Sequence, residues 1–276
     1  MIVRVPASSA NLGPGFDALG MAVALHAEVG VGLAGEGAQQ ADEHHPATVA
    51  FRAHGGEGPL WVRSPIPVGR GMGFSGAVRV GGVVAAHAQR HGGGHRDLQA
   101  ALPQLLRLST QLEGHADNVA ASLYGGIVAT AGGHAVRVPM SFDPALVFWV
   151  PAFVTRTDES RTNLPSSVPM ADAVFNIGHT ALLVAALAAG EVHMLREATQ
   201  DRLHQTLRLA AAVPSRDALE AAVAAGAWAA WLSGSGPTVA AMCAIDDAEQ
   251  LAAALPADGH TKILRIDHAG AVIEGS

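Results

Sequence analysis

The sequence predicts an α+β fold that is organised in two successive blocks. Segments with strand and helix patterns occur in both halves of the chain, and no tandem repeat is visible. The 276 residues suit one large or two ordinary domains, and an apolar fraction of 49% is enough to fill a sizeable core. A strongly apolar segment at 145–151 opens the second block. We therefore expect a boundary within 140–150 and divide the chain into domains 1–145 and 146–276.

In the first block, short apolar segments predict strands, and polar or glycine-rich stretches separate them. Residues 2–6 alternate in polarity until Pro6, and residues 7–17 are small, polar and rich in glycine, which predicts a loop. The other expected strands are 18–33, 60–63 and a hairpin over 126–138. Residues 35–58 predict a solvated loop that contains a short helix at 48–53.

Helical patterns fill the rest of the first block and alternate with strands in the second. Residues 77–88 are small and apolar on most faces, and residues 98–112 place leucines on related faces of one helix. In the second block the expected strands are 145–151, 227–232, 239–244 and 261–267. The expected helices there are 172–189, 201–208, 218–226 and 247–255.

Composition and charge argue against several classes of protein. The net charge is −7 with no basic block, which argues against a nucleic-acid partner. The single cysteine, Cys243, excludes an intramolecular disulfide and a cysteine-rich zinc site. The first residues lack a signal-peptide core, and no uninterrupted apolar run is long enough to be an obvious membrane span. We therefore expect a cytoplasmic protein without a membrane partner.

The strongest functional candidate is a glycine loop at 64–76 that leads into the helix expected at 77–88. A glycine loop before a helix N-terminus suits a phosphate, because free N–H groups converge there and glycine lets an anion approach the backbone. Gly71, Gly73 and Gly76 have the dinucleotide spacing, but no buried strand ends in an acid at the required distance, and the Walker pattern is absent. On the loop alone, a nucleotide site and a purely structural turn remain equal alternatives.

Two polar clusters offer further candidates. Asn11 and Asp17 lie in the first loop and could bind a polar substrate, although by themselves they favour an Asx turn with a cap. The segment 113–118 holds Glu, His, Asp and Asn between apolar runs, which suits Mg²⁺ or a hydroxyl substrate as well as a helix connection. Three histidines spaced four apart could form a helical stripe, but three glycines at 92–94 favour a loop without a metal. They are His87, His91 and His95.

Four stretches together resemble the GHMP kinase superfamily, and within it the homoserine kinases. They are 5–20 (VPASSANLGPGFDALG), 66–77 (IPVGRGMGFSGA), 113–126 (EGHADNVAASLYGG) and 232–239 (LSGSGPTV). Residues 157–165 and 172–176 also fit this resemblance, which spans nearly the whole chain in the same order.

The resemblance implies a two-domain GHMP kinase fold. Its N-terminal, ATP-binding domain would be like domain 2 of ribosomal protein S5, its C-terminal domain would be ferredoxin-like, and the site would lie between them. The implied reaction is ATP- and Mg²⁺-dependent phosphorylation of the L-homoserine hydroxyl, a step of threonine biosynthesis. A homodimer is also implied.

The resemblance further assigns roles by position. The residues assigned to ATP are Pro67, Gly69, Arg70, Gly71, Met72, Gly73, Phe74, Ser75 and Gly76. Those assigned to homoserine are Asn11, Asp17, His115, Asn118, Thr157 and Arg208, with catalytic roles for Asp117 and Arg161. Ser75 and Glu113 would hold the metal. Aspartate suits the substrate ammonium and arginine its carboxylate, and Asp117 would face the reacting hydroxyl, with its action as a base left open.

The chain departs from the family pattern mainly on its nucleotide side. Phe74 stands where a serine is usual, and Gly76 stands where alanine is usual. A phenylalanine cannot donate a hydrogen bond to a phosphate and needs far more room. Three functions therefore stay open: a homoserine kinase, a catalytically weak relative that binds an amino acid or a nucleotide, and a GHMP kinase for another hydroxylated substrate. We also expect that alanine at Gly71 or Gly73 reduces the affinity for the nucleotide more than it reduces the stability of the fold.

Overall fold

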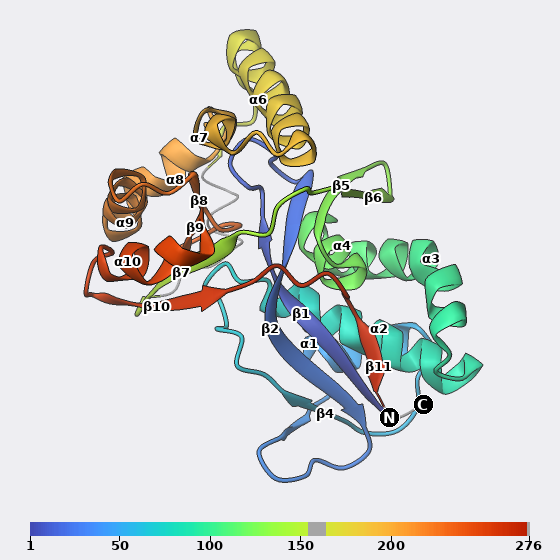
Figure 1. Cartoon of the computed structure of the whole chain (residues 1–276). Helices are drawn as coiled ribbons and strands as arrows, with labels where there is room; N and C mark the ends of the chain where they lie inside the picture. The colour runs from blue at the N-terminus through green and yellow to red at the C-terminus, as the bar shows by residue number, and fades with distance from the viewer. Residues whose placement is uncertain (154–163, 275–276) are drawn as a thin grey trace.

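The computed structural model describes residues 1–153 and 164–274 and places them in two antiparallel sheets with helices packed against them (Figure 1). This arrangement agrees with the expected α+β organisation in two successive blocks. The first sheet has seven strands in the order β11-β1-β2-β4-β3, with β5 pairing β2 and β6 pairing β5. Its strands are β1 Ile2–Ala10, β2 Leu19–Val31, β3 Gln39–Ala41, β4 Leu60–Arg63, β5 Ile127–Ala131, β6 His134–Val138 and β11 Val272–Glu274.

Strand β1 is longer than its sequence pattern predicts, because it continues from Pro6 through Ala10. The register with β2 shifts between Pro6 and Ala7, and pairing then resumes down to Ala10 opposite Gly20. Ser8 and Ser9 are fully buried in this part of the strand and donate or accept hydrogen bonds within the protein. The expectation of a loop beginning at residue 7 was therefore wrong, since small residues that are polar in sequence fill a tight core here.

Four helices pack against the first sheet, at the right and rear of Figure 1. They are α1 Pro46–Ala53, α2 Phe74–His91, α3 His95–Glu113 and α4 Asp117–Tyr124. Helix α2 lies so close to its neighbours that a Cβ on Gly82 would meet the Ala47 carbonyl oxygen at 2.2 Å, and one on Gly81 would meet Val29 at 2.5 Å. The small residues of α2 therefore serve close packing.

His87 and His91 lie on helix α2 and His95 is the first residue of α3, so the expected loop is limited to the glycines at 92–94. Helix α2 runs on to His91 and ends before Gly92, whose N–H donates to the Ala88 carbonyl. The rings of His87 and His91 are 4.8 Å apart, and the His54 ring stacks on that of His87 at 6.2 Å. Over residues 1–153 and 164–274, no group of three or more His, Cys, Asp or Glu side chains could hold a metal ion.

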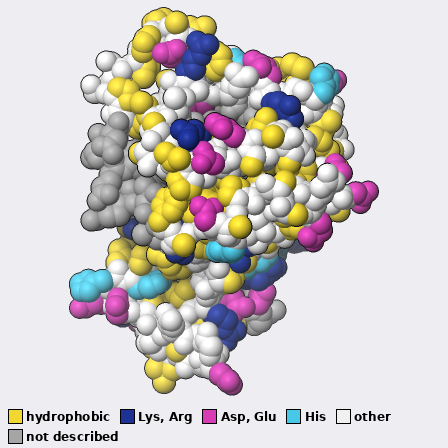
Figure 2. Space-filling view, turned by 90° about the vertical axis from the view of Figure 1, so that its left-hand side faces the viewer, with side chains coloured by type: hydrophobic (Ala, Val, Ile, Leu, Met, Phe, Trp, Pro, Cys, Tyr) yellow, Lys and Arg dark blue, Asp and Glu magenta, His cyan; other side chains and the backbone are white. Residues whose placement is uncertain are grey.

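The second sheet has four strands in the order β10-β7-β9-β8. These are β7 Ala145–Pro151, β8 Ala229–Leu232, β9 Val239–Cys243 and β10 Gly259–Leu264. The helices of this block are α6 Met170–Ala189, α7 Leu195–Ala198, α8 Gln205–Ala211, α9 Val213–Ala224 and α10 Ala248–Ala253, with short 3₁₀ turns at Val192–Met194 and Ile245–Asp247. On the face shown in Figure 2, basic and acidic side chains are interspersed and neither forms a continuous patch.

One strand does not follow the division of the chain into two blocks. The second sheet begins at β7, close to the expected division at residue 145, but β11 leaves that block and pairs with β1 in the first sheet. The two ends of the described chain therefore lie side by side (Figure 1).

Helix α6 is the one helix in the described ranges that is long and apolar enough, by length and composition, to cross a membrane. Its polar side chains make contacts inside the protein: Asn176 and Thr180 both donate to the Pro14 carbonyl, at 3.0 and 3.1 Å. These contacts attach α6 to the loop that follows β1.

A buried chain of hydrogen bonds joins the two sheets. The Trp231 indole N–H donates to Ser9 Oγ at 3.0 Å, and the Ser9 and Ser233 hydroxyl oxygens are 2.8 Å apart. Ser233 Oγ donates to the Gly71 carbonyl at 2.6 Å. Because the Ser233 proton is used on Gly71, the Ser9 hydroxyl must donate to Ser233, and the chain runs in one direction. It fixes the glycine loop of the first block against the Ser233 turn of the second.

We predict that Ser233→Ala lowers the free energy of unfolding by roughly 1–3 kcal/mol, because it leaves the Gly71 carbonyl without its donor and the buried Ser9 hydroxyl without an acceptor for its proton. Urea titration followed by circular dichroism measures this change. The exposed Ser167 provides the control, and Ser167→Ala should change stability little. Equal midpoints for the two variants would contradict the role assigned to Ser233.

We also predict that stability falls as the pH drops from 7.5 to 5.5. Burial is the main cause that lowers the pKa of both His54 and His87 below 6.5. The folded protein therefore binds fewer protons than the unfolded chain, so stability is complete above pH 6.5 and declines as the pH falls below it. Urea midpoints at both pH values measure the decline, which His87→Gln should reduce. The side chain of His44 is 88% exposed, so His44→Gln should leave the decline unchanged.

Candidate active site

A cleft of about 160 Å³ lies where the two blocks meet. Five elements line it: the loop after β1, the glycine loop with the start of α2, the end of α3 with the start of α4, helix α8, and the turn between β8 and β9. The lining residues are Ala10, Asn11, Phe16, Asp17, Pro67, Val68, Gly69, Gly71, Met72, Gly73, Phe74, Ser75, Glu113, His115, Asp117, Asn118, Arg208, Gly234 and Ser235. The fold thus gathers the four motifs of the sequence around one cavity.

The loop after β1 is held in an unusual backbone conformation. Asn11, Leu12 and Asp17 have φ of 71°, 49° and 56°, in the left-handed region that asparagine and aspartate tolerate better than other non-glycine residues. Asn11 holds the loop from inside: its Nδ2 donates to the Gly234 carbonyl at 3.0 Å, and its Oδ1 accepts from the Asp17 N–H at 3.1 Å. Asn11 therefore fixes the position of Asp17 at the cleft.

Asp117 is the first residue of α4 and is 2% exposed. Its Oδ1 accepts from the Asn118 N–H at 2.7 Å and lies 3.2 Å from Nδ1 of His115. The positive end of the helix dipole favours a carboxylate at this place. Asn118 Oδ1 in turn accepts from the Ser8 hydroxyl at 2.9 Å, so Asp117 is connected to β1 through Asn118.

The glycine loop leads directly into helix α2, as its sequence predicts. Gly69, Gly71 and Gly73 all have positive φ, between 68° and 75°, and Gly73 is the N-cap of α2. The first N–H groups of the helix have no partners within the helix, and Phe74 and Ser75 at its start line the cleft, which suits a phosphate. A Cβ at Gly71 would meet the Ser233 carbonyl oxygen at 2.2 Å, and one at Gly73 would meet Ser8 Oγ at 2.0 Å.

These contacts change what alanine should do at the two glycines. Both added methyl groups would meet protein atoms, so we now expect substitution to impair folding at least as much as nucleotide affinity. Two other expected ATP residues do not line the cleft. Arg70 donates through Nη2 to the Ala152 carbonyl at 2.7 Å, and Gly76 packs on α4, where a Cβ would lie 3.3 Å from Asn118.

Phe74 lies at the junction of this cleft with a second cavity of about 740 Å³. The second cavity is lined by Phe74 and Val68, which the two cavities share, and by residues of β2, β3 and β4 and the segment after β4. The Phe74 ring meets the His45 ring edge to face at 6.3 Å and is half-buried. The ring thus forms part of the wall where the two cavities meet.

Ser75 and Glu113, the two residues expected to hold the metal, lie side by side, and Ser75 Oγ donates to Glu113 Oε2 at 3.0 Å. A hydroxyl and a carboxylate are hard oxygen ligands that suit Mg²⁺. The guanidinium of Arg79, however, also donates to both groups. Two protein oxygens whose charge is already balanced do not suit a resident metal. They suit an Mg²⁺ ion that arrives with phosphate oxygens, because Mg²⁺ is usually held by few protein ligands together with phosphates and water.

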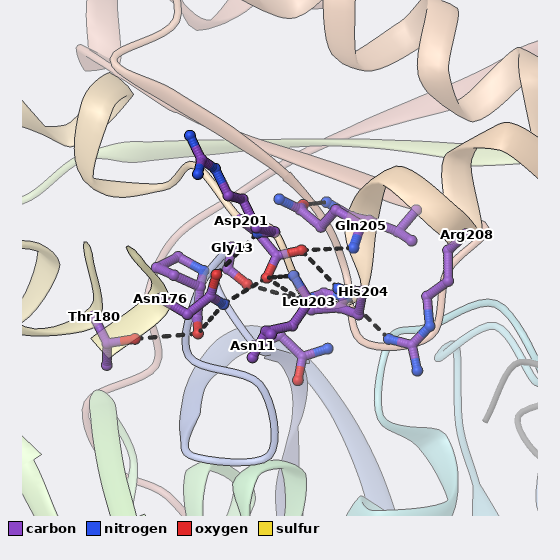
Figure 3. Close-up of polar contacts among 12 residues, drawn as sticks. Asn11, Gly13, Asn176, Thr180, Asp201, Leu203, His204, Gln205 and Arg208 are labelled. Carbon is purple, nitrogen blue, oxygen red and sulfur yellow. Dashed lines mark hydrogen bonds and ion pairs between the residues drawn. The ribbon is translucent and has the colours of Figure 1, made fainter. Parts of the chain in front are cut away.

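Arg208 enters the cleft from helix α8 and is held by a buried polar network (Figure 3). Its Nη1 lies 3.1 Å from Nδ1 of His204 and donates to the Gly234 carbonyl at 3.2 Å. Nε2 of His204 is 2.8 Å from the Gly13 carbonyl oxygen. His204 therefore connects the arginine to the loop that positions Asp17.

The network fixes the proton on His204. Arginine can only donate, so Nδ1 of His204 must accept and the ring must be neutral, with its proton on Nε2. Burial is the main cause that lowers the pKa of His204, which agrees with a neutral ring. Asp201 accepts four N–H hydrogen bonds at 2.7–3.1 Å, from the Asn176 side chain and from the backbone of Leu203, His204 and Gln205. Burial opposes its ionisation, but the hydrogen bonds from the Asn176 side chain and from the backbone N–H groups of Gln205 and His204 leave the pKa of Asp201 below its usual value.

Most of the residues selected from the sequence meet in this cleft. Thr157 and Arg161 lie outside the described residues. Sequence reasoning missed Phe16, Val68, Gly234, Ser235 and Arg79. The Ser-Gly-Ser-Gly-Pro turn at 233–237 and the four-residue spacing of Ser75 and Arg79 were the signals that could have indicated them.

Comparison with known proteins agrees with this architecture. The family description "GHMP kinases N terminal domain" matches residues 39–126, and "GHMP kinases C terminal" matches residues 183–261. The chain is 41% identical to the homoserine kinase of Gloeobacter violaceus over 92% of this chain and 91% of that protein. It is 40% identical to that of Streptomyces coelicolor over 98% and 93% of the two chains.

A crystal structure of homoserine kinase from Cytophaga hutchinsonii has the same fold, with a TM-score of 0.83 and 23% identity over 98% of this chain and 96% of that one. The two family matches and the two curated relatives together span nearly the whole chain, including the cleft. The chain therefore belongs to the GHMP kinase family, the ATP-dependent small-molecule kinases, in the branch that holds the homoserine kinases.

Proposed function

We propose that this protein transfers the γ-phosphoryl group of ATP to the side-chain hydroxyl of L-homoserine. The observation that carries the proposal is the division of the cleft into two halves. The glycine loop and the start of α2 form a phosphate-binding half, and Asp17, Asp117 and Arg208 form a half suited to an amino acid. The relatives named homoserine kinase are about 40% identical over nearly the whole chain.

The nucleotide would extend across both cavities. Its phosphates would lie on the N–H groups at the start of α2, and its base and ribose would occupy the cavity beside β2, β3 and β4. Phe74 would then lie beside the nucleotide at the junction, where an aromatic ring can pack without donating a hydrogen bond. Ser75 and Glu113 would hold Mg²⁺, which neutralises charge on the phosphates when it is bound.

The amino acid would be held at both ends. Arg208 would bind its carboxylate, since a guanidinium pairs with a carboxylate through two parallel hydrogen bonds, and Asp17 would bind its ammonium. Thr157 and Arg161 are proposed to complete this half from the segment 157–165. The hydroxyl would then lie near Asp117.

Catalysis would depend mainly on positioning. A new bond forms between the homoserine oxygen and the γ-phosphorus, the bond from that phosphorus to the bridging oxygen breaks, and ADP leaves. Asp117, fixed by Asn118 and His115, orients the hydroxyl and accepts its proton. Preorganisation of this acid is the part of the reaction that the geometry of the cleft supports most directly.

We expect Asp117→Asn to lower kcat at least about 10²-fold, because the hydroxyl loses its proton acceptor while binding contacts remain. A coupled ADP-release assay with homoserine and Mg²⁺-ATP measures this effect, with the exposed Asp258→Asn as control. A wild type without homoserine-dependent turnover would overturn the proposed function.

Phe74→Ser distinguishes the kinase from a binding protein in the same assay. We expect the wild type to be active and the serine variant to stay within about tenfold of it, because the Phe74 ring packs against His45 and forms part of the wall between the two cavities. Activity in the serine variant alone would favour a binding protein with an altered phosphate site.

We expect Arg208→Lys to raise KM for homoserine by roughly 10–100-fold and to leave KM for ATP within about twofold, since a lysine ammonium cannot replace a bidentate guanidinium. Initial rates with each substrate varied in turn measure both constants. Arg216→Lys, on the exposed side of α9, is the matched control. An equal change in both KM values would show that Arg208 acts on the whole fold and not on the amino acid.

A further inference from the structure

Arg79 places a fixed positive charge directly behind the expected metal ligands. It lies one helical turn after Ser75 on α2, and its Nη1 donates to both Ser75 Oγ and Glu113 Oε2. Ser75 Oγ donates to the same carboxylate oxygen, so the three groups form a closed triangle. Arg79 does not line the cleft, whereas Ser75 and Glu113 do. The guanidinium therefore contacts the pair from the protein side.

The burial of this triangle makes the charge balance important. The Arg79 and Glu113 side chains are only 22% and 10% exposed. Arg79 Nε is buried and has no hydrogen-bond partner within the described part of the chain. A buried carboxylate is costly unless a cation accompanies it, and the guanidinium supplies that cation before any metal arrives.

The triangle also orients the Ser75 hydroxyl. Its proton points to Glu113, and one of its lone pairs accepts from Arg79. One lone pair remains, and Ser75 itself lines the cleft. The Ser75 hydroxyl can therefore bind a cation through one lone pair. The negative charge of Glu113 is already balanced by the positive charge of Arg79.

We propose that Arg79 is a built-in cation that keeps the Ser75–Glu113 pair free of divalent metal until a nucleotide supplies phosphate oxygens. The inference rests on the proposed function for the identity of that nucleotide, but it concerns metal affinity and not turnover. A divalent ion near the guanidinium is repelled, and this repulsion is weakly screened because the triangle is buried. The negative charge of the phosphates offsets the repulsion, so metal and nucleotide bind together.

Mn²⁺ in place of Mg²⁺ tests the proposal without any chemistry, because free Mn²⁺ is measured by electron paramagnetic resonance. Wild type, Arg79→Met, Arg79→Lys and Glu113→Gln are titrated without nucleotide. Wild type, Arg79→Lys and Glu113→Gln should bind Mn²⁺ equally weakly. Arg79→Met, which keeps the length of the side chain and removes its charge, should bind at least about tenfold more tightly. Equal affinity of Arg79→Met and wild type would overturn the proposal.

A second measurement on the wild type keeps the test valid if Arg79→Met does not fold. Mn²⁺ is titrated with and without a non-hydrolysable ATP analogue. Support would be weak binding alone and tight binding with the analogue, with the gain reduced in Glu113→Gln. Tight binding without nucleotide that Glu113→Gln abolishes would overturn the proposal. A protein that fails the ADP-release assay but shows the Arg79→Met gain would refute the proposed function and leave the role of Arg79 standing.

Discussion

The hydrogen-bond chain from Trp231 through Ser9 and Ser233 to Gly71 is the contact on which the site depends. It has members in β1, β8, the turn after β8 and the glycine loop, so it crosses from one sheet to the other. Every group in it is satisfied by the next, and a buried hydroxyl without a partner would be costly. The distance between the phosphate-binding half and the amino-acid half of the cleft is consequently set by short bonds in the core, not by surface loops.

A second constraint is the backbone of the loop at 11–17. Three non-glycine residues there take positive φ, and such conformations persist only where the surroundings hold them. The side chains that hold this loop come from elsewhere in the chain. Asn176 and Thr180 donate hydrogen bonds to the Pro14 carbonyl, and His204 donates one to the Gly13 carbonyl. Helices α6 and α8 of the second block thus shape a loop of the first block, which explains why a cleft between two domains can still be preorganised.

Sequence reasoning found the order of elements from local patterns, and it found most cleft residues from the resemblance of four short motifs to the GHMP kinases. Composition alone singles out three segments: the glycine loop, the apolar strand at 145–151 and the polar cluster at 113–118. Sequence reasoning failed where a distant partner decides the outcome. Ser8 and Ser9 are strand residues only because the core of both sheets satisfies them. Arg79 lies in an apolar helix, and only the meeting of α2 with the end of α3 shows that its charge faces Glu113. Strand β11 has three residues and no pattern of its own.

The pairing of β11 with β1 has a consequence for the order of folding during synthesis. The first strand of the sheet leaves the ribosome early, but its neighbour on the β11 side spans residues 272–274 and is made after the entire second block. The edge of β1 stays unpaired until β11 has been synthesised, and during that time its exposed backbone groups can pair with another chain. A fragment that stops near residue 145 would retain this open edge permanently. The first sheet is therefore completed only after β11, the last strand of the described chain, has been made.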